Sequence, residues 1–380
     1  MTEFRDKSCC RPSLWLLLVC ALSGRMVAAA AELPDQARRT AITRAVEYLR
    51  QNQAADGSFS AQAGPGVTSL VVTAALANGI PVRDPLVARG LDYLQGFVHD
   101  DGGIYGTGSL YQNYETCLAI MCFSRANGDG RFDKLLQQAD GFVRKLQWDE
   151  GEGRDLSDPF YGGAGYGNHQ RPDLSNTSFL VEALKASGAG PDDPALQRAL
   201  VFVSRCQNEE SPHNTLPFSA KHPDGGFYYT GAAGGASQAG TYADGGLRSY
   251  GSMTYAGLKS MIYAGLGPDD PRVKAATDWL RGNYSLQENP GMLAEMSQAG
   301  LYYYYHMFAK ALDAWGQPTF VDEKNVAHDW RQELLQELVS RQRADGSWVN
   351  DNPRWLEGDP YLVTGYALLS LSYCQAPGRP

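Results

Sequence analysis

The feature of this sequence that most constrains its fold is a short segment that occurs near both ends. Residues 53–59 read Gln-Ala-Ala-Asp-Gly-Ser-Phe, and residues 342–348 read Gln-Arg-Ala-Asp-Gly-Ser-Trp. In each copy an amphipathic, helix-like stretch ends at the Gln, and Asp-Gly-Ser and an aromatic residue follow. Internal repetition of this kind indicates an array of one small supersecondary unit.

Helical periodicity is the dominant pattern between the two copies. Apolar residues recur at three- and four-residue spacing in segments bounded by Gly, Pro, Asp or Asn, whereas strand-like alternation is scarce. The sequence therefore predicts an all-α protein. The expected helices cover about twelve segments, at residues 36–53, 67–78, 85–98, 111–126, 132–148, 174–187, 194–208, 250–266, 271–284, 298–315, 328–343 and 360–374.

These segments alternate between two kinds. One kind carries charged positions and an aromatic-Leu or aromatic-Val pair, which suits an outward-facing helix. The other is poor in charge and opens with Thr, which suits a helix buried on most sides. Two Gly-Pro-Asp-Asp-Pro segments, at 190–194 and 267–271, lie at the same distance after Thr177 and Thr254. Their Asp residues are expected to be N-caps and turn residues.

Six inner and six outer helices predict an (α/α)6 toroid of six helix-pair repeats, forming a single domain over residues 32–380. An open solenoid is the alternative. It would need polar capping repeats, and here the first and last repeats carry the clearest motif.

The N-terminus has the pattern of a secretory signal peptide over residues 1–31. Arg5, Lys7 and Arg11 precede the apolar run 14–22, and small residues follow at 28–31. The run is too short to span a bilayer. A lipid anchor at Cys20 is the alternative, although Val19 is a poor residue before a lipidated cysteine. We expect a secreted or periplasmic protein with no transmembrane segment in its mature chain.

Charge and cysteine content exclude several classes of function. Removing residues 1–31 takes away four basic and two acidic groups, which moves the formal charge from −9 to −11. An acidic chain without a basic block is a poor candidate for binding nucleic acid or an anionic membrane. Cys117, Cys122, Cys206 and Cys374 remain, with no CxxC or Cys/His spacing, so we expect buried small side chains, no metal and no cofactor.

The Gln-x-x-Asp-Gly-Ser-aromatic segments resemble the QW repeats of squalene and oxidosqualene cyclases and of protein prenyltransferase β subunits. The resemblance covers nearly the whole mature chain. It implies a toroid whose inner helices surround an aromatic-lined cavity that holds an isoprenoid.

The catalytic motifs of these families are not intact here. Triterpene cyclases protonate their substrate with a DxDD-Thr motif, because clustered carboxyls make a strong acid. The matching residues 173–177 read Asp-Leu-Ser-Asn-Thr, so Ser175 and Asn176 replace the acids. The fourth and sixth inner helices supply no Cys or His for the zinc of a prenyltransferase, and no DDxxD motif occurs.

Alignment on the inner-helix starts identifies the candidate site residues. Glu115 is the only carboxylate among the equivalent positions, and inner-helix N-termini direct free N–H groups toward that face. Four consecutive tyrosines, 302–305, cover every side of one helix, and a histidine follows them. The candidate catalytic residues are Asp173, Glu115 and His306, and the candidate ligand-binding residues are Asn176, Tyr250, Tyr255, Tyr303, Tyr304 and Asp359.

Four of these candidates have a structural alternative. Glu115 suits a first-turn residue favoured by the helix dipole, Asp173 and Asp359 suit N-caps, and His306 suits a hydrogen-bonded core histidine. The Gly-rich insertion over 208–247 suits either a lid or a surface loop.

Four functions remain open from the sequence. The leading hypothesis is an exported toroid that binds an apolar or isoprenoid-type ligand in an aromatic central cavity. The alternatives are a noncanonical terpenoid cyclase or transferase, a glycan-active (α/α)6 lyase or hydrolase, and an interaction scaffold. A glycan enzyme predicts an open polar cleft with two carboxylates about 5–10 Å apart, and a scaffold predicts a filled centre.

Overall fold

The computed structural model describes residues 1–2, 35–167 and 169–375. Apart from residues 1–2, the expected signal peptide and its cleavage site lie outside the described residues. Within them, a helix covers residues 35–52. No helix in the described part of the chain has both the length and the apolar character needed to cross a bilayer.

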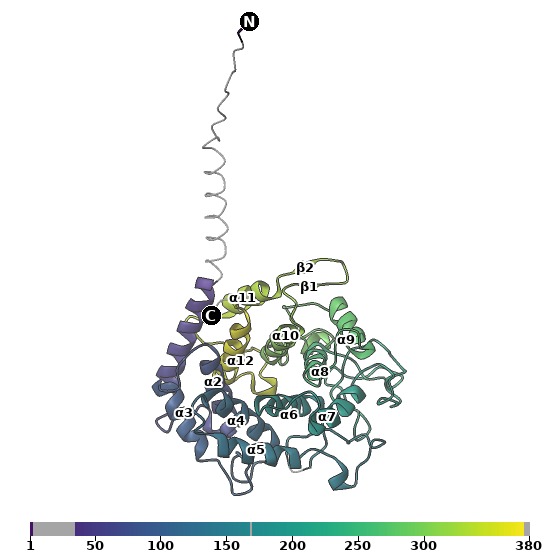
Figure 1. Cartoon of the computed structure of the whole chain (residues 1–380), viewed down its shortest axis with the longest axis horizontal. Coiled ribbons are helices and arrows are strands. Elements are labelled where there is room, and N and C mark those ends of the chain that lie inside the picture. The colour runs from purple at the N-terminus through teal and green to yellow at the C-terminus, as the bar shows by residue number, and fades with distance from the viewer. Residues whose placement is uncertain (3–34, 168, 376–380) are drawn as a thin grey trace.

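Six inner helices form a closed ring (Figure 1). Each packs against the next inner helix along the chain, and the sixth packs against the first, which closes the ring. The bounds match the expected segments to within a few residues. The inner helices are α2 (Pro65–Ala77), α4 (Gln112–Ala126), α6 (Leu174–Ala186), α8 (Gly251–Tyr263), α10 (Leu301–Trp315) and α12 (Pro360–Tyr373).

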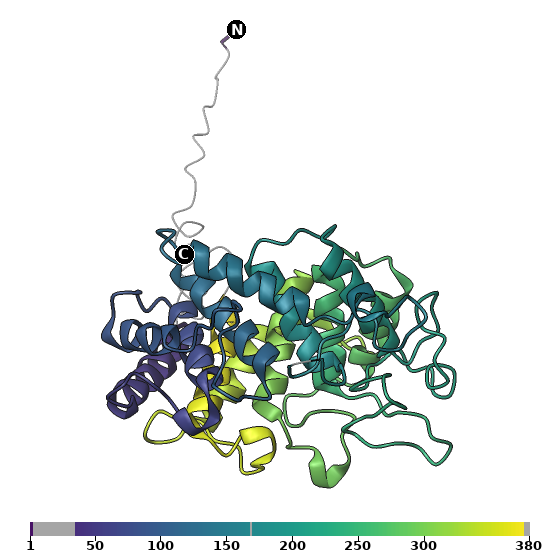
Figure 2. The same ribbon diagram turned by 90° about the horizontal axis from the view of Figure 1, so that it is seen from below.

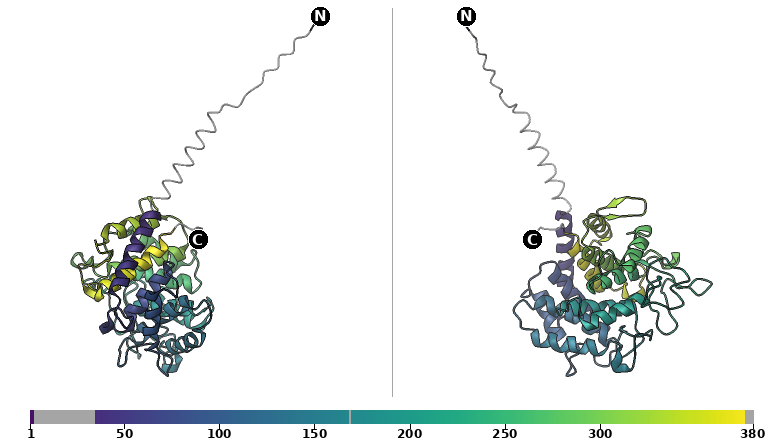
Figure 3. Two further views of the ribbon diagram at one scale, coloured as in Figure 1. Left: turned by 90° about the vertical axis from the view of Figure 1, so that its left-hand side faces the viewer. Right: turned by 45° about the vertical axis from the view of Figure 1, so that its right-hand side comes forward.

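The second set of helices surrounds this ring. Five of them pack against an inner neighbour, and the first contacts α12 through Tyr48 and Tyr361. It consists of the helix over residues 35–52, α3 (Pro85–Gln95), α5 (Asp133–Lys145), α7 (Pro194–Arg205), α9 (Pro271–Gly282) and α11 (Trp330–Arg341). The predicted toroid of six helix pairs is confirmed. The helix over residues 35–52, purple in Figure 3, lies beside the C-terminal helices in yellow.

Short elements lie in the connections. The strands β1 (Phe320–Val321) and β2 (Ala327–His328) form an antiparallel hairpin before α11. Four 3-10 turns cover η1 (Ala61–Ala63), η2 (Glu150–Glu152), η3 (Ala294–Met296) and η4 (Arg354–Leu356). The insertion over residues 208–247, teal to green in Figure 2, lies at the rim of the molecule.

The two kinds of helix differ in burial and capping as the pattern predicts. In α2 every residue from Pro65 to Ala75 is buried, whereas α3 buries one face. Asp193 and Asp270, from the two Gly-Pro-Asp-Asp-Pro segments, accept hydrogen bonds from backbone N–H groups at the starts of α7 and α9. The prediction of N-caps is therefore confirmed for these two residues.

The threonines near the inner-helix starts make the same contact in five repeats. Each hydroxyl oxygen accepts a hydrogen bond of 2.9–3.1 Å from a backbone N–H in the loop that leads into its helix. The bonds run from Phe59 to Thr68, Ile104 to Thr116, Ala164 to Thr177, Phe227 to Thr254 and Trp348 to Thr364. The loop backbone thus gains a buried partner in each repeat.

The repeated glutamines hold neighbouring repeats together. Each donates from Nε2 to the carbonyl of a glycine in its own loop and to a carbonyl of the next outer helix. Gln53, Gln147, Gln207 and Gln342 make this pair of bonds, and Gln342 bonds to Ala41, so the last outer helix is joined to the first. The glutamine that recurs in the sequence repeat is therefore also the residue whose hydrogen bond closes the ring.

Candidate functional site

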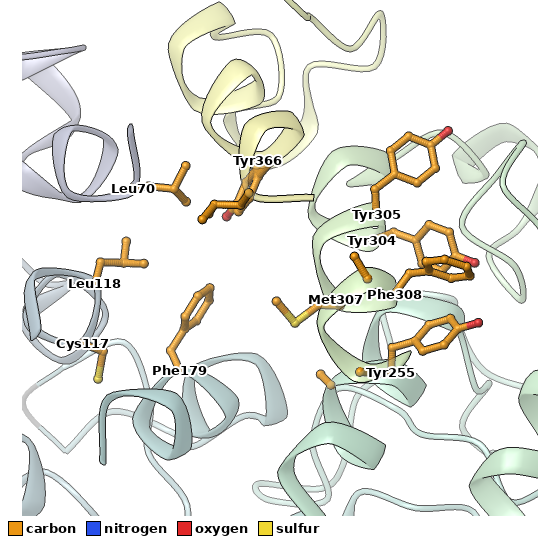
Figure 4. Packing of buried hydrophobic residues seen from close by; sticks show 14 of the residues in the cluster. Leu70, Cys117, Leu118, Phe179, Tyr255, Tyr304, Tyr305, Met307, Phe308 and Tyr366 are labelled. Atoms are coloured by element: carbon orange, nitrogen blue, oxygen red, sulfur yellow. The ribbon is translucent and has the colours of Figure 1, made fainter. Parts of the chain in front are cut away.

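A cavity of about 420 Å³ lies inside the ring, and residues of all six inner helices line it. The lining residues come mainly from the C-terminal halves of those helices. Arg125 and Ala186 at its edge are exposed, so the cavity reaches the surface at that end. Its apolar lining comprises Leu70, Leu118, Met121, Phe179 and Leu369. Figure 4 shows Leu70, Leu118 and Phe179 directed into the central space.

A cluster of buried charges borders the polar part of the lining. Glu182 of α6 forms ion pairs with Lys259 of α8 and Lys310 of α10. The side chains of Glu182 and Lys259 are 1% and 0% exposed. Burial alone would raise the pKa of Glu182, but the two ammonium groups lower it to about 2. Burial lowers the pKa of Lys259 to about 8, although Glu182 opposes this effect.

His306 of α10 lies beside this cluster in the cavity lining. Its Nδ1 atom is buried and has no hydrogen-bond partner in the described part of the chain. Burial, together with the positive charge of Lys310, lowers the pKa of His306 to about 3. The imidazole is therefore neutral at neutral pH, so it is not a cationic acid in this environment.

Asp173 lies at the start of α6, on the opposite side of the ring from the open end of the cavity. Its carboxylate accepts hydrogen bonds of 2.8 Å from both the backbone N and the Nδ2 of Asn176. The side chain is buried, and this burial raises the pKa of Asp173 to about 6. Asp173 and Asn176 are thus brought together as cap and partner, and neither lines the cavity.

Four aromatic side chains from four inner helices lie between the cavity and the inner-helix starts. Tyr303 packs against Phe179 and Tyr366, with ring centroids 6.2 and 6.0 Å apart, and Phe179 packs against Tyr114. We call Tyr114, Phe179, Tyr303 and Tyr366 the aromatic layer. The Tyr303 hydroxyl lies 3.0 Å from the Ser175 hydroxyl, so Ser175 of the altered DxDD segment contacts this layer.

Glu115 and Asp359 hold loops together. Glu115 is 3% exposed and accepts a hydrogen bond of 3.0 Å from the backbone N of Gly106. Burial raises the pKa of Glu115. Asp359 caps α12 by accepting from the backbone N–H groups of Tyr361 and Leu362. Neither carboxylate lies in the lining of the central cavity.

The candidate tyrosines predicted from the sequence lie in three places. Tyr303 belongs to the aromatic layer. Tyr304 and Tyr255 pack between the two helix layers, where the Tyr304 hydroxyl donates to the Ser285 carbonyl at 2.6 Å. Figure 4 shows Tyr255, Tyr304 and Tyr305 directed away from the central space. Tyr250 is buried as the residue before α8 and likewise does not line the cavity.

The structure also contains functional candidates that the sequence reasoning missed. Glu182, Lys259 and Lys310 are charged residues on inner helices that are otherwise poor in charge, and this contrast was visible in the sequence. Glu357 lies in the loop before α12 and accepts hydrogen bonds from the backbone N–H groups of Tyr302 and Tyr303. Burial raises the pKa of Glu357 to about 7.

The site offers few groups for a metal. Among the described residues, no three His, Cys, Asp or Glu side chains are grouped closely enough to hold a metal ion. Cys117, Cys122, Cys206 and Cys374 are all free and buried, which confirms the interpretation of these residues as buried small side chains.

Comparisons of the sequence with known families agree with the resemblance. The family model of the squalene-hopene cyclase C-terminal domain matches residues 18–118. A probable squalene–hopene cyclase from Sinorhizobium fredii is 30% identical over 129 residues, which make up 33% of this chain and 19% of that protein. The chain thus spans about a fifth of the length of this relative.

Comparisons of the structure show the same fold. A variant of the type II terpene cyclase MstE from Scytonema, in complex with its product merosterolic acid A, superposes with a TM-score of 0.53 at 14% identity, over 90% of this chain and 98% of that one. A second variant, in complex with its substrate geranylgeranyl dihydroxybenzoate, gives a TM-score of 0.51 at 13% identity, over 90% and 98% of the two chains.

Proposed function

The chain has the terpenoid-cyclase-like fold, and from this premise we propose that it binds an isoprenoid-type ligand in the cavity at the centre of its ring. The observation that carries the proposal is the cavity of about 420 Å³ with its apolar lining. This volume lies within the range of small-molecule sites, which are typically ~300–1,000 Å³ and mainly apolar. A pure scaffold would instead have a filled centre.

The relatives support this class of ligand. One similar structure holds geranylgeranyl dihydroxybenzoate and another holds merosterolic acid A. In the present chain, Leu70, Leu118 and Phe179 give the cavity a surface suited to a branched hydrocarbon chain. A glycan enzyme is not favoured, because Glu182 is the only carboxylate that the described residues place in the cavity lining, and it is already paired with two lysines.

A noncanonical cyclase is the second candidate, and Asp173 is the observation that favours it. Its raised pKa of about 6 leaves a fraction of the carboxyl protonated near neutral pH. Ser175 and Asn176, however, add no further carboxyl beside it. Incubation with squalene or geranylgeranyl substrates, followed by analysis for cyclised products, tests this candidate. Products that disappear in Asp173→Asn would establish it over simple binding.

Native mass spectrometry of protein purified from its host tests the binding proposal, with an isoprenoid-type lipid as the expected adduct. Binding of farnesol by the lipid-free protein, measured by calorimetry, gives an independent readout. Leu369→Trp should weaken farnesol binding because the larger side chain fills the cavity. Leu156→Trp, at a position 60% exposed, is the matched control. Absence of both a lipid adduct and farnesol binding would overturn the proposal.

We also propose that the chain is exported after cleavage of residues 1–31. The charged start, the short apolar run and the small residues at 28–31 support this proposal. N-terminal sequencing of the protein from its host tests it. A mature N-terminus near residue 32 is expected, whereas recovery of intact Met1 in the cytoplasmic fraction would contradict it.

A further inference from the structure

The open end of the cavity differs chemically from its apolar lining. Arg125, Lys185 and Lys310 lie there, on α4, α6 and α10. We propose that the isoprenoid ligand carries a carboxylate head group, which Arg125 and Lys185 bind at the open end while the hydrocarbon tail lies against the apolar lining. This inference rests on the proposed function and names the class of its ligand.

The charges of the cavity lining do not balance. The described residues of the lining include three cations, Arg125, Lys185 and Lys310, and one carboxylate, Glu182. Glu182 is already shared between Lys310 and Lys259, so it cannot neutralise the other two cations. The cavity therefore carries a net positive charge. An anionic ligand would neutralise charge that is otherwise costly to hold in a partly desolvated space.

Two of these cations have no acidic partner. Lys185 donates to the carbonyl of Ala189 at 3.1 Å, and it forms no ion pair within the described part of the chain. No ion pair of Arg125 occurs among the described residues either, in contrast to most arginines of the outer helices, such as Arg50 and Arg144. Guanidinium and ammonium groups form their strongest hydrogen bonds with carboxylate or phosphate oxygens.

Two polar atoms in the same cavity lining are unsatisfied. The Nδ1 atom of His306 and the Oγ atom of Ser124 are buried, belong to lining residues and have no hydrogen-bond partner among the described residues. Buried polar atoms are nearly always hydrogen-bonded, so such orphans mark a position where a ligand or water completes the site. A hydroxyl and a neutral imidazole N–H can both donate to a carboxylate oxygen.

The apolar and the charged residues lie in different parts of the cavity, which sets the orientation of the ligand. The apolar residues Leu70, Leu118 and Phe179 lie deeper, toward the aromatic layer, whereas Arg125 is exposed at the edge. In a ligand with an anionic head and a hydrocarbon tail, the head would lie near Arg125 at the edge and the tail would lie against the deeper apolar residues. A planar carboxylate offers two oxygen atoms, and the two cations without an acidic partner can each donate to one of them.

Isothermal titration calorimetry with farnesoic acid, farnesol and farnesyl diphosphate tests the inference on the whole protein. We expect farnesoic acid to bind about tenfold more tightly than farnesol, because a charge-assisted hydrogen bond contributes that much. Arg125→Gln combined with Lys185→Gln should remove this advantage, so that farnesoic acid and farnesol bind with equal affinity. Lys145→Gln, at an exposed position near the end of α5, is the matched control and should change neither affinity.

The outcomes separate this inference from the proposed function. Equal affinities for farnesoic acid and farnesol, or an acid preference that survives the double substitution, would overturn the inference and leave isoprenoid binding intact. Tighter binding of farnesyl diphosphate than of farnesoic acid would overturn the carboxylate assignment. Absence of binding by all three probes would overturn the proposed function and the inference with it.

Discussion

The side-chain amide of Gln342 donates a hydrogen bond of 2.9 Å to the backbone carbonyl of Ala41, across 301 positions of the sequence. The same Nε2 atom donates to the carbonyl of Gly346, also at 2.9 Å. The bond to Ala41 joins the last outer helix to the first. Because identical bonds join earlier repeats, the ring closes with the same contact that builds it.

Gln342→Ala should therefore destabilise the ring at its closure. The substitution leaves two carbonyl groups without their side-chain donor, and such a loss typically costs ~1–3 kcal/mol of the free energy of unfolding. Urea unfolding followed by circular dichroism measures this change. Gln51→Ala, in the same kind of helix but with an exposed side chain, is the control. Equal unfolding free energies for the two variants would show that the closing bond contributes nothing to stability.

Gly346→Ala tests the other half of the same contact. Gly346 has φ +93°, and an added Cβ atom would lie 2.5 Å from the carbonyl oxygen of Arg44. Positive φ and overpacking each cost ~1–3 kcal/mol, so we expect a loss of ~3 kcal/mol in unfolding free energy. Gly79→Ala is a matched control, because Gly79 has φ +83° with nothing within 4 Å of its added Cβ. A loss no greater than that of Gly79→Ala would contradict the tight contact.

Much of this architecture could be predicted from the sequence, for a physical reason. Periodicity, Thr at the inner-helix starts and the Gln and Gly of the loops are local signals, and each acts through contacts repeated in successive units. A pattern that recurs several times along the chain therefore indicates that successive repeats pack against each other. The ring closure follows because the first and last copies carry the same residues.

The centre of the ring was less predictable, because its contacts occur only once. Tyr303 and Tyr304 are neighbours in the sequence, yet Tyr303 joins the aromatic layer and Tyr304 packs between the helix layers. The helix rotation that separates them is set by tertiary packing. Glu182, Lys259 and Lys310 come from three inner helices and meet only in the folded ring. No local signal pairs residues that are so far apart in the chain.

Glu357 should make stability depend on pH. Burial raises its folded-state pKa to about 7, above the ordinary value of 4.5. Its contribution to stability is therefore fully present below pH 4.5 and is lost as the pH rises through 7. Between low and high pH, the pKa difference corresponds to a loss of ~3 kcal/mol in the unfolding free energy of wild type. Glu357→Gln cannot ionise at this position and should not show this loss. Unfolding free energies of both proteins at pH 4.5 and pH 8 measure the effect.

The control for this measurement is Glu295→Gln, because Glu295 is exposed. Its difference from wild type should be the same at the two pH values. Glu357→Gln should gain stability relative to wild type between pH 4.5 and pH 8. If the difference in unfolding free energy between Glu357→Gln and wild type were the same at both pH values, ionisation of Glu357 would not destabilise the folded protein.

The ion pairs of Glu182 should be strongly coupled in stability. Glu182→Gln leaves Lys259 buried without a counter-charge, and breaking a buried pair in this way typically costs ~3–5 kcal/mol. Lys259→Met should cost much less, because Glu182 keeps Lys310 as its partner and a hydrophobic side chain of similar volume suits the buried site.

A double-mutant cycle separates pairing from packing. In the Lys259→Met background, Glu182→Gln should cost at least ~2 kcal/mol less than in wild type, because the most deeply buried cation is no longer present. Urea unfolding of the four proteins at pH 7 gives the coupling free energy. Additive costs would mean that the two side chains do not stabilise each other, and that Lys310 alone neutralises Glu182 in the cavity lining.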